Sequence, residues 1–446
     1  MKREALERVR CPRCGEPCQP TQIAREAGND LVHAVVRCGC ADYPIAEGIL
    51  FLHRAESHRY VAELLLGAIR AGGEDSIRAA VAAACNANAR DLLRALNLLH
   101  GSGARGRLET LIRRPLLELS SRRVERSLRD DARYGDLIHG PYFRYRFSSD
   151  SFWSIWPTLP WLGERPTCLV DAGCGHGHAS FVISRLVRPE FHFCVDRKLS
   201  SLVLVRRFFA PQAQLIAMDL GGSLPFADRS VDAVFSIDSL HYVQPVRVTV
   251  SEFERVLGDA GRLLALHFHN ALVYNPAAGD PLRWDLWMRL FNGWGARWIP
   301  EPALHQDFAA GRIAELERRY DDGSYAAANA LALLAVPRGG RLESLEPAGW
   351  SPLDLPAHWS INPMYAVQAD GTVLRLSRRP QPKDYATENE FAQRHLPERL
   401  ELPAALQQEL LALGEASLRK LPLERHSALE GWFRHGVLVP LPPRWQ

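Results

Sequence analysis

Residues 167–181 read TCLVDAGCGHGHASF, and this stretch decides the fold prediction for the 446-residue chain. A short apolar run ends in Asp171, glycines alternate with other residues at Gly173, Gly175 and Gly177, and an apolar helical pattern follows. Glycine is required where the backbone turns tightly or must approach a ligand without an interfering Cβ atom. The first turn of a helix behind such a loop presents free N–H groups to ligand oxygens. The stretch therefore predicts a strand, a ligand-binding loop and a helix.

The segments around this loop extend the pattern into an α/β domain. Between residues 165 and 270, short apolar or β-branched runs alternate with helical patterns, which is typical of βαβ units and a parallel sheet. The third glycine comes one residue too early for the dinucleotide fingerprint G-x-G-x-x-G, and His178 occupies the fingerprint position. This spacing argues against a nicotinamide or flavin cofactor. Asp196 ends the second predicted strand, where a carboxylate can accept hydrogen bonds from both hydroxyls of a ribose.

The acid followed by G-x-G-x-G resembles motif I of the class I S-adenosylmethionine-dependent methyltransferases. Two further stretches, LPFADRSVDAVFSIDSLHY at 224–242 and EFERVLGDAGRLL at 252–264, are similar to segments of the methyltransferase type 11 domain. The motifs follow one another in the order of that family. The resemblance implies a Rossmann-like methyltransferase sheet, S-adenosyl-L-methionine as cofactor, and methyl transfer as the reaction.

The resemblance also implies roles for the residues of the first loop. Gly173, Gly175 and Gly177 match the glycines that surround the methionine portion of the cofactor. Asp171 matches the acid that reaches the amino group of the cofactor, often through water. The alternative for Asp171 is an acid that caps the loop at the end of its strand.

The later strand ends match further cofactor contacts of the family. Asp196 matches the ribose ligand. Asp219 and Leu220, after the third strand, match the contacts to the adenine. The backbone near Ser236 and Ile237 matches the rim of the cofactor site after the fourth strand.

Methyl transfer from a sulfonium needs alignment of the acceptor, and a general base only if the acceptor atom carries a proton. His241 could serve as that base at the mouth of the pocket, although a helix-start residue without catalytic role is the favoured interpretation. His267 and His269 alternate along the predicted fifth strand, so both point to one face, as a metal pair would. No acid or cysteine pair stands beside them in the sequence, so we favour two strand-end histidines with a structural role.

Three tryptophans precede the first strand of the predicted core, where the family often has a lid. They could wall an apolar or aromatic substrate, but ordinary packing is the favoured interpretation. The residues are Trp153, Trp156 and Trp161.

Five of the nine cysteines lie within the first forty residues, which favours a metal site over disulfides in a chain without a secretion signal. Cys11-Pro-Arg-Cys14 and Cys38-Gly-Cys40, the latter followed by YPIAEGI, resemble the short zinc-ribbon family that includes activator subunits of methyltransferases. The resemblance implies a structural zinc ion held by these four thiolates. The second pair is C-x-C where that family has C-x-x-C, so Cys18 is a possible substitute ligand, and a ribbon without metal is the alternative.

Composition bounds the remaining function classes. The net charge of +3, from 54 basic and 51 acidic residues, does not by itself indicate a nucleic-acid partner. No run approaches the roughly 20 apolar residues of a membrane span. The chain begins without an apolar segment, so we expect no secretory signal and a cytoplasmic location. The bias toward arginine and alanine is typical of a bacterial source.

These observations predict an α/β methyltransferase core with added segments. The predicted units are a zinc-ribbon-like domain at 1–54, a helical segment at 55–140, a methyltransferase core at 141–275 whose last strands are expected at 345–378, a helical insert or lid at 276–344, and a C-terminal helical extension at 379–446.

Three functions fit the motifs. The first is methyl transfer to a small molecule or natural product, including a peptide. The second is an RNA methyltransferase, suggested by the zinc ribbon and the arginine-rich residues 101–146. The third is a non-catalytic scaffold that keeps the cofactor fold, which the intact glycine loop and Asp196 disfavour.

Overall fold

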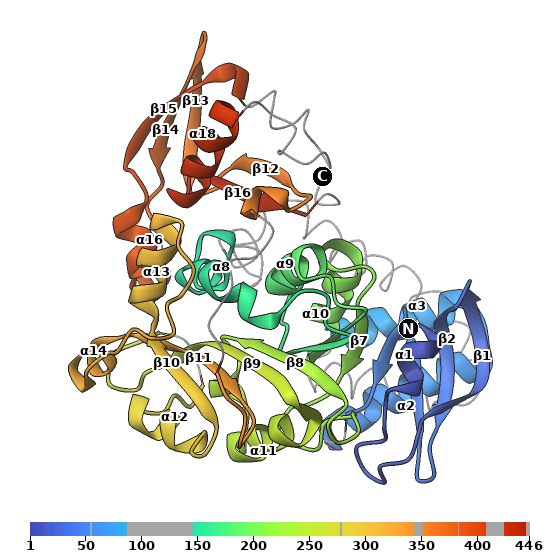
Figure 1. Cartoon of the computed structure of the whole chain (residues 1–446). Helices are drawn as coiled ribbons and strands as arrows, with labels where there is room; N and C mark the ends of the chain where they lie inside the picture. The colour runs from blue at the N-terminus through green and yellow to red at the C-terminus, as the bar shows by residue number, and fades with distance from the viewer. Residues whose placement is uncertain are drawn as a thin grey trace.

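The computed structural model describes residues 1–53, 56–86, 146–276, 279–342, 351–381, 383–406 and 423–442. Within these ranges, eleven strands form one mixed sheet that runs through the body of the molecule (Figure 1). From edge to edge the strand order is β1-β2-β3-β4-β7-β6-β5-β8-β9-β11-β10. The bounds are β1 Gln19–Ala27, β2 Asp30–Arg37, β3 Asp42–Ala46, β4 Ile49–Phe51, β5 Cys168–Ala172, β6 Phe191–Asp196, β7 Gln214–Ala217, β8 Val231–Ile237, β9 Leu257–His269, β10 Gly295–Pro300 and β11 Ala330–Val336.

Five parallel strands in the middle of the sheet form the α/β core. β5 pairs with β6 on one side and with β8 on the other, β7 follows β6, and β9 follows β8. Every residue of β5 is buried, as expected for a parallel strand covered on both faces. β11 pairs antiparallel with β9, and β10 pairs antiparallel with β11. The order confirms the Rossmann-like fold class.

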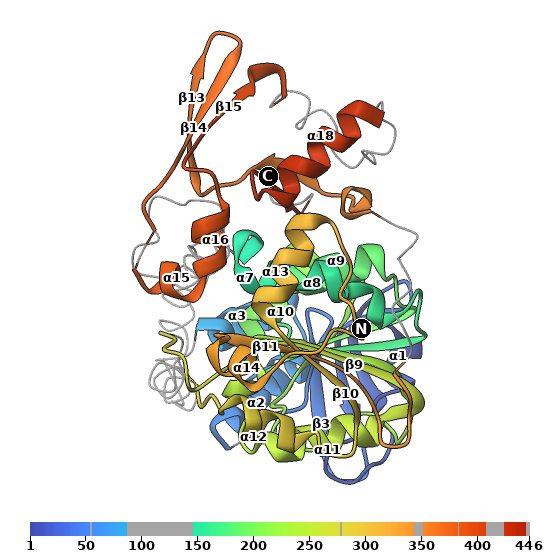
Figure 2. The same ribbon diagram turned by 60° about the vertical axis from the view of Figure 1, so that its left-hand side comes forward.

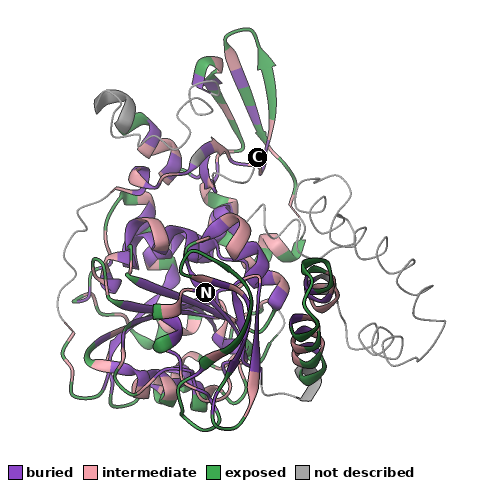
Figure 3. Ribbon diagram, turned by 90° about the vertical axis from the view of Figure 1, so that its right-hand side faces the viewer, coloured by how far each residue is buried: buried purple, intermediate pink, exposed green. Residues whose placement is uncertain are grey.

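Helices cover both faces of the core, because alternate strand residues point to opposite sides. Leu169 of β5 joins one apolar cluster and Val170 joins another. Figure 3 shows the buried residues concentrated on the strands and on the inward sides of the helices. The face of Leu169 is covered by α7 Asp150–Trp153, α8 Ile155–Thr158, α9 His178–Leu186 and α13 Glu301–Ala310. The face of Val170 is covered by α1 Arg3–Glu7, α11 Val246–Val256 and α12 Trp284–Leu290.

The N-terminal unit continues the sheet of the core. β4 pairs in parallel with β7, so that Ile49 aligns with Leu215 and Phe51 with Ala217. The N–H of Leu52 then donates to the carbonyl of Ala217 at 2.8 Å. Helices α2 Glu56–Ala71 and α3 Glu74–Asn86 pack with α10 Leu199–Leu204 on one side of this junction. The unit predicted as a separate ribbon therefore shares backbone hydrogen bonds and core with the α/β domain.

The last two strands of the core correct the sequence-based prediction. They are β10 and β11, within the range 276–344 that was predicted as a helical insert or lid, and they do not come from 345–378. The run ALALLAV of β11 is buried at every position. A continuous apolar run has no alternation, so periodicity alone cannot distinguish a buried strand from a buried helix. The same range also contains the predicted helices α12, α13 and α14 (Asp322–Ala327).

The C-terminal part lies above the core and shares the apolar cluster of Leu169 with it (Figure 2). Its strands form two small sheets, one of β12 and β16 and one of β13, β14 and β15, and the hairpin predicted through Gly371 joins β13 to β14. The helical extension predicted at 379–446 also contains strands, because its described residues form β15 and β16 beside α15, α16 and α18. The bounds are β12 His358–Ile361, β13 Tyr365–Asp370, β14 Val373–Arg378, β15 Arg399–Pro403, β16 Leu438–Leu441, α15 Lys383–Glu388, α16 Glu390–His395 and α18 Leu423–Arg434.

A buried carboxylate joins the C-terminal unit to the core. Asp150, at the start of α7, accepts hydrogen bonds from the N–H groups of Phe391 and Ala392 at 3.0 and 2.8 Å. Its own N–H donates to the side-chain oxygen of Asn389 at 3.0 Å. Burial raises the pKa of Asp150, while the backbone donors act in the opposite direction.

Some predictions concern residues outside the described ranges. Most of the predicted helical segment, from 87 onward, is among them, as is nearly all of the arginine-rich stretch 101–146. Among the described helices, none combines the length and apolar character needed to cross a membrane.

Because the sheet continues from β4 into β7, shortening a buried side chain of β4 should destabilise the folded protein. Leu50 is fully buried in β4, and Leu50→Ala should lower the free energy of unfolding by about 2–5 kcal/mol because it leaves a cavity in a shared core. Urea denaturation followed by circular dichroism measures this change. Ile23→Ala, on the exposed strand β1, is the control and should change stability by less than about 0.5 kcal/mol. An equally small effect of Leu50→Ala would contradict a shared core.

Candidate cofactor site at the carboxyl edge of the sheet

The loop between β5 and α9 has a backbone shape that requires glycine. Gly173, Gly175 and Gly177 have φ angles of +79°, +53° and +96°. A Cβ atom at Gly173 would lie 2.6 Å from the Cβ atom of Ser239. One at Gly177 would lie 2.8 Å from a methyl group of Val205. A Cβ atom at Gly175 would meet nothing within 4 Å, so a ligand can approach the backbone at that point.

Asp171 lies beneath this loop and is fully buried. One carboxylate oxygen accepts a hydrogen bond from the hydroxyl of Ser180, and the other, Oδ1, has no hydrogen-bond partner among the described residues. Burial raises the pKa of Asp171 to about 8, and the nearby Cys194 acts in the same direction. An unsatisfied buried carboxylate oxygen is a group that a cationic or hydrogen-bonding ligand would stabilise.

Asp196 ends β6 and lies beside the glycine loop. Its Oδ2 accepts from the N–H of Gly175 at 2.9 Å, and its Oδ1 accepts from the N–H of Lys198 at 2.8 Å. Burial raises the pKa of Asp196, and these two backbone donors counteract the rise. Each carboxylate oxygen can accept more than one hydrogen bond, so the side chain keeps capacity for two hydroxyl groups of a ligand.

Asp219 and Leu220 follow β7, the next strand along the edge. The Oδ2 atom of Asp219 lies 3.1 Å from Nδ1 of His53, and Nε2 of His53 lies 2.8 Å from the carbonyl oxygen of Arg197. His53 comes from the N-terminal unit, directly after β4, and its side chain is fully buried. No sequence motif points to this histidine, because its position depends on the pairing of β4 with β7. The side chain of Asp219 is 41% exposed, which leaves it accessible to a ligand.

The end of β8 closes the site opposite Asp196. Ser236 donates from its hydroxyl to the carbonyl oxygen of Ala172 at 2.9 Å and lies 2.7 Å from the hydroxyl of Ser239. These contacts hold the end of β8 against the end of β5. Ile237 is buried, and Asp238 follows with a positive φ of 53°. The predicted loop, acids and rim therefore lie along one edge of four adjacent strands.

His241, the candidate base, lies in a short 3-10 turn at Leu240–Tyr242. Its ring is buried and stacks on His269, with ring centroids 4.0 Å apart, and neither ring nitrogen has a hydrogen-bond partner among the described residues. Burial lowers the pKa of His241 to about 3, although Asp238 acts in the opposite direction. The imidazole is therefore neutral at neutral pH and can only act as a weak base.

The strand-end histidines His267 and His269 lie next to carboxylates. The sequence motifs did not indicate these neighbours. Nδ1 of His267 lies 2.7 Å from Oε2 of Glu301, and the N–H of His267 donates to Oε1 at 2.6 Å. Burial acts to lower the pKa of His267, but Glu301 and Asp238 raise it to about 9. Glu301 begins α13 and is itself fully buried.

Asp238 is the centre of a second set of contacts. Its Oδ1 lies 3.1 Å from Nε2 of His269, and its Oδ2 accepts from the Arg146 guanidinium at 2.6 Å. Although burial opposes ionisation, Arg146 and the two strand histidines hold the pKa of Asp238 well below its ordinary value. Glu388, the last residue of α15, lies close enough to join Asp238, His267 and His269 in one group.

The tryptophans before β5 are packing residues. Trp153 stacks on Phe308 with ring centroids 5.4 Å apart, and Trp156 meets Phe433 edge to face at 5.0 Å. Trp161 donates from its indole N–H to the carbonyl oxygen of Leu263. All three side chains are buried, which agrees with the favoured interpretation.

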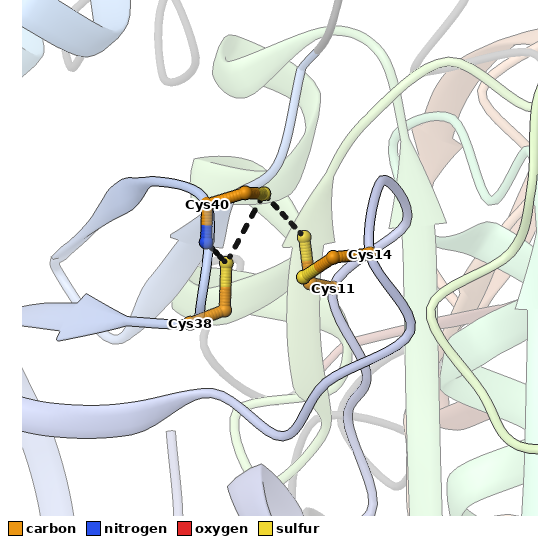
Figure 4. A group of neighbouring side chains, drawn as sticks. All are labelled: Cys11, Cys14, Cys38 and Cys40. Carbon is orange, nitrogen blue, oxygen red and sulfur yellow. Dashed lines mark hydrogen bonds between the residues drawn. The ribbon is translucent and has the colours of Figure 1, made fainter.

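The four cysteines of the N-terminal unit come together from two loops (Figure 4). The Sγ atoms of Cys11, Cys14, Cys38 and Cys40 all lie within 4.8 Å of one another, with Cys40 3.6 Å from Cys11 and 3.5 Å from Cys38. A tetrahedral zinc ion with Zn–S bonds of about 2.3 Å places its sulfur atoms about 3.8 Å apart. The group fits such an ion. Cys18 is buried outside it, and burial raises the pKa of its thiol to about 12.

The buried acid under the loop predicts how stability depends on pH. Asp171 keeps its proton in the folded chain up to about pH 8, whereas an unfolded aspartate ionises near pH 4. The unfolded state therefore holds fewer protons in this window, and the contribution of Asp171 to stability falls as the pH rises from about 4 to 8. Asp171→Asn should reduce this fall, as measured by urea denaturation at pH 5 and 7.5. Asp228→Asn, on the exposed surface, is the control, and equal pH dependence in all three proteins would contradict the assignment.

Comparison with known proteins agrees with the geometry of this edge. Residues 170–265 match the family model described as a methyltransferase domain. The chain is 29% identical over 148 residues to the ubiquinone/menaquinone biosynthesis C-methyltransferase UbiE of Bradyrhizobium diazoefficiens, a match that covers 30% of this chain and 58% of that protein. It is 35% identical over 98 residues to the malonyl-acyl-carrier-protein O-methyltransferase of Herminiimonas arsenicoxydans, covering 22% and 36%. The matched part of the chain thus spans a little over half of the length of the first relative and about a third of the length of the second.

Solved structures resemble the chain more loosely. A complex of the Trm112 methyltransferase activator with a methyltransferase from Haloferax volcanii shows 17% identity and a TM-score of 0.34, over 47% of this chain and 97% of the other. A likeness at that level carries no argument about this protein. The matched motifs, the strand order and the glycine loop together identify residues 170–265 as a class I S-adenosylmethionine-dependent methyltransferase domain.

Proposed function

We propose that this chain transfers the methyl group of S-adenosyl-L-methionine to a small-molecule acceptor by in-line displacement. One observation carries the proposal. The glycine loop, Asp196 and Asp219 lie at the ends of three adjacent parallel strands, β5, β6 and β7, at the edge where open α/β sheets bind their ligands.

Each part of this edge has a distinct task in the proposed reaction. The open backbone at Gly175 and the unpartnered oxygen of Asp171 suit the methionine portion of the cofactor. Asp196 has acceptor capacity for both ribose hydroxyls. Asp219 and Leu220 suit the adenine, and His53 orients the carboxylate of Asp219. When bound, the cofactor supplies an already activated methyl group, so the protein has only to align the acceptor and exclude water.

A base is needed only for an acceptor atom that carries a proton at working pH. His241 is neutral because of its burial, and both its nitrogens lack hydrogen-bond partners among the described residues, so one of them can accept a hydrogen bond from an acceptor hydroxyl. Its depressed pKa makes it better suited to orienting such a group than to holding its proton.

A small-molecule acceptor is supported by the named substrates of the relatives. These relatives are named for ubiquinone or menaquinone biosynthesis, fatty acids and malonyl-acyl-carrier protein. The balanced net charge is consistent with such acceptors. The arginine-rich stretch 101–146, one of the two features that suggest an RNA substrate, lies almost wholly outside the described residues.

We also propose that Cys11, Cys14, Cys38 and Cys40 hold one structural zinc ion. Four thiolates leave no open coordination position, so the ion would stabilise the N-terminal unit and take no part in the chemistry. Through the pairing of β4 with β7, that unit holds His53 against Asp219.

Loss of the ribose ligand is the sharpest test of the cofactor assignment. Asp196→Ala removes an acceptor of two charge-assisted hydrogen bonds, which should weaken S-adenosylmethionine binding by at least about 100-fold. Isothermal titration calorimetry measures this loss, and circular dichroism checks that the fold remains. Asp228→Ala, with an exposed carboxylate, should bind like the wild type. Unchanged affinity of the Asp196 variant would overturn the assignment.

Transfer of label identifies the acceptor class. The purified chain, incubated with methyl-labelled cofactor and a bacterial extract, should place the label in the small-molecule fraction. Label recovered in RNA would replace the proposed acceptor class. A chain that binds the cofactor but labels no fraction would support the scaffold interpretation.

The proposed zinc ion has its own test. Cys11→Ser combined with Cys14→Ser removes two of four thiolates and should reduce the zinc content by one ion per chain. Elemental analysis of protein purified without chelators measures this difference. Cys18→Ser is the matched control, because Cys18 lies outside the group, and it should keep the full zinc content. Equal zinc content in all three proteins would contradict the site.

A further inference from the structure

A second group of metal-binding side chains lies apart from the cysteines, at the carboxyl edge of β8 and β9. It consists of Asp238, His267, His269 and Glu388, here called the histidine–carboxylate cluster. Each residue offers one ligand atom, and these atoms all lie within 4.8 Å of one another. The residues come from three separate segments: the end of β8, the end of β9 and the last residue of α15.

We propose that the histidine–carboxylate cluster binds a divalent transition-metal ion. Two imidazole nitrogens and two carboxylate oxygens are a ligand set that suits ions such as Zn²⁺, Fe²⁺ or Mn²⁺. Metal–ligand bonds of about 2.0–2.2 Å place tetrahedral ligand atoms about 3.4 Å apart. The 3.1 Å between Nε2 of His269 and Oδ1 of Asp238 is slightly below this value, and no two ligand atoms of the cluster lie more than 4.8 Å apart, so an ion requires only small shifts.

The imidazole of His269 has a ring nitrogen that an ion could bind. This side chain is 1% exposed, and its Nε2 atom lies 3.1 Å from Oδ1 of Asp238. Nε2 is buried and has no hydrogen-bond partner among the described residues. A cation bound in the cluster would be held by the lone pair of Nε2 and by Oδ1 of Asp238.

His267 is oriented as metal-binding histidines usually are. Its Nδ1 atom lies 2.7 Å from Oε2 of Glu301, which is fully buried. A carboxylate that accepts from one ring nitrogen fixes the tautomer and leaves the lone pair of the other nitrogen for an ion. The second oxygen of Glu301 accepts from the N–H of His267 at 2.6 Å, which holds the ring and the carboxylate together.

The charges around the cluster balance with a dication. Asp238, Glu301 and Glu388 contribute three negative charges, and Arg146, 2.6 Å from Asp238, contributes one positive charge. In the metal-bound state both imidazoles are neutral, because an ion displaces a proton from the ring nitrogen that it binds, and the net charge of this set is then two negative. One divalent ion neutralises it.

The position of the cluster indicates what the ion would do. Asp238 directly follows the cofactor rim at Ser236 and Ile237, whereas Glu388 belongs to the C-terminal unit. An ion shared by them would fix α15 over the edge of the sheet where the acceptor is expected. The inference concerns binding of metal alone, so it stands or falls independently of the proposed methyl transfer.

Cobalt titration of the full chain distinguishes the two metal groups. After removal of metal with a chelator, the wild type should bind two Co²⁺ ions per chain by equilibrium dialysis. The thiolate-to-cobalt absorption of the cysteine group should saturate after one equivalent. His269→Gln and Glu388→Gln should each weaken binding of Co²⁺ to the histidine–carboxylate cluster. The loss should exceed the roughly 10–100-fold that follows from removing a residue that only supports a metal ligand. Both variants should keep the thiolate-to-cobalt absorption of the cysteine group. The combined Cys11→Ser and Cys14→Ser variant should lose the thiolate absorption and should still bind one Co²⁺ ion at the histidine–carboxylate cluster.

The control is His305→Gln. His305 is a buried histidine beside Glu301 but outside the cluster, and its variant should bind both ions. If a cluster variant does not fold, proton NMR of the wild type provides the test, since the second Co²⁺ ion should shift the ring signals of two histidines. Binding of a single Co²⁺ ion with full thiolate absorption would overturn the proposal. So would a second ion that both folded cluster variants retain or that shifts no histidine signal.

Discussion

Backbone hydrogen bonds between β5 and its two parallel neighbours, β6 and β8, are the interaction on which the candidate site depends. Parallel pairing brings the carboxyl ends of these strands to one edge, so that the loops after them become neighbours. The N–H of Gly173 donates to the carbonyl of Val195 at 2.8 Å, which anchors the start of the glycine loop to the end of β6. Ser236 anchors the end of β8 to the end of β5 in the same way.

The same pairing extends to the N-terminal unit. Without β4, strand β7 would be an exposed sheet edge with unpaired N–H and C=O groups. β4 satisfies that edge in parallel, and the chain leaving it carries His53 to Asp219. The cysteine group therefore lies in a unit that shares the sheet of the domain, and any ion there would stabilise one flank of the candidate site through the strands between them.

The C-terminal unit meets the opposite flank through buried carboxylates. Asp150 receives two backbone N–H groups from α16, and Glu388 reaches the histidines of β9. Burying these charges is unfavourable unless they are paired or hydrogen-bonded. Their positions thus specify how the C-terminal unit lies over the core. Apolar packing, including that of Trp153 and Trp156, also joins these parts.

The sequence by itself determined the α/β core, the glycine loop, the acids at the strand ends and the two cysteine pairs, because each is encoded by short spacings that act on the local backbone. The sequence did not predict β11, because an uninterrupted apolar run has no periodicity that distinguishes a buried strand from a buried helix. The tertiary structure alone decided that β4 joins the sheet, that His53 meets Asp219, and that Glu301 and Glu388 approach His267. Those contacts join segments far apart in the chain, and only the packing of whole elements brings such side chains within bonding distance.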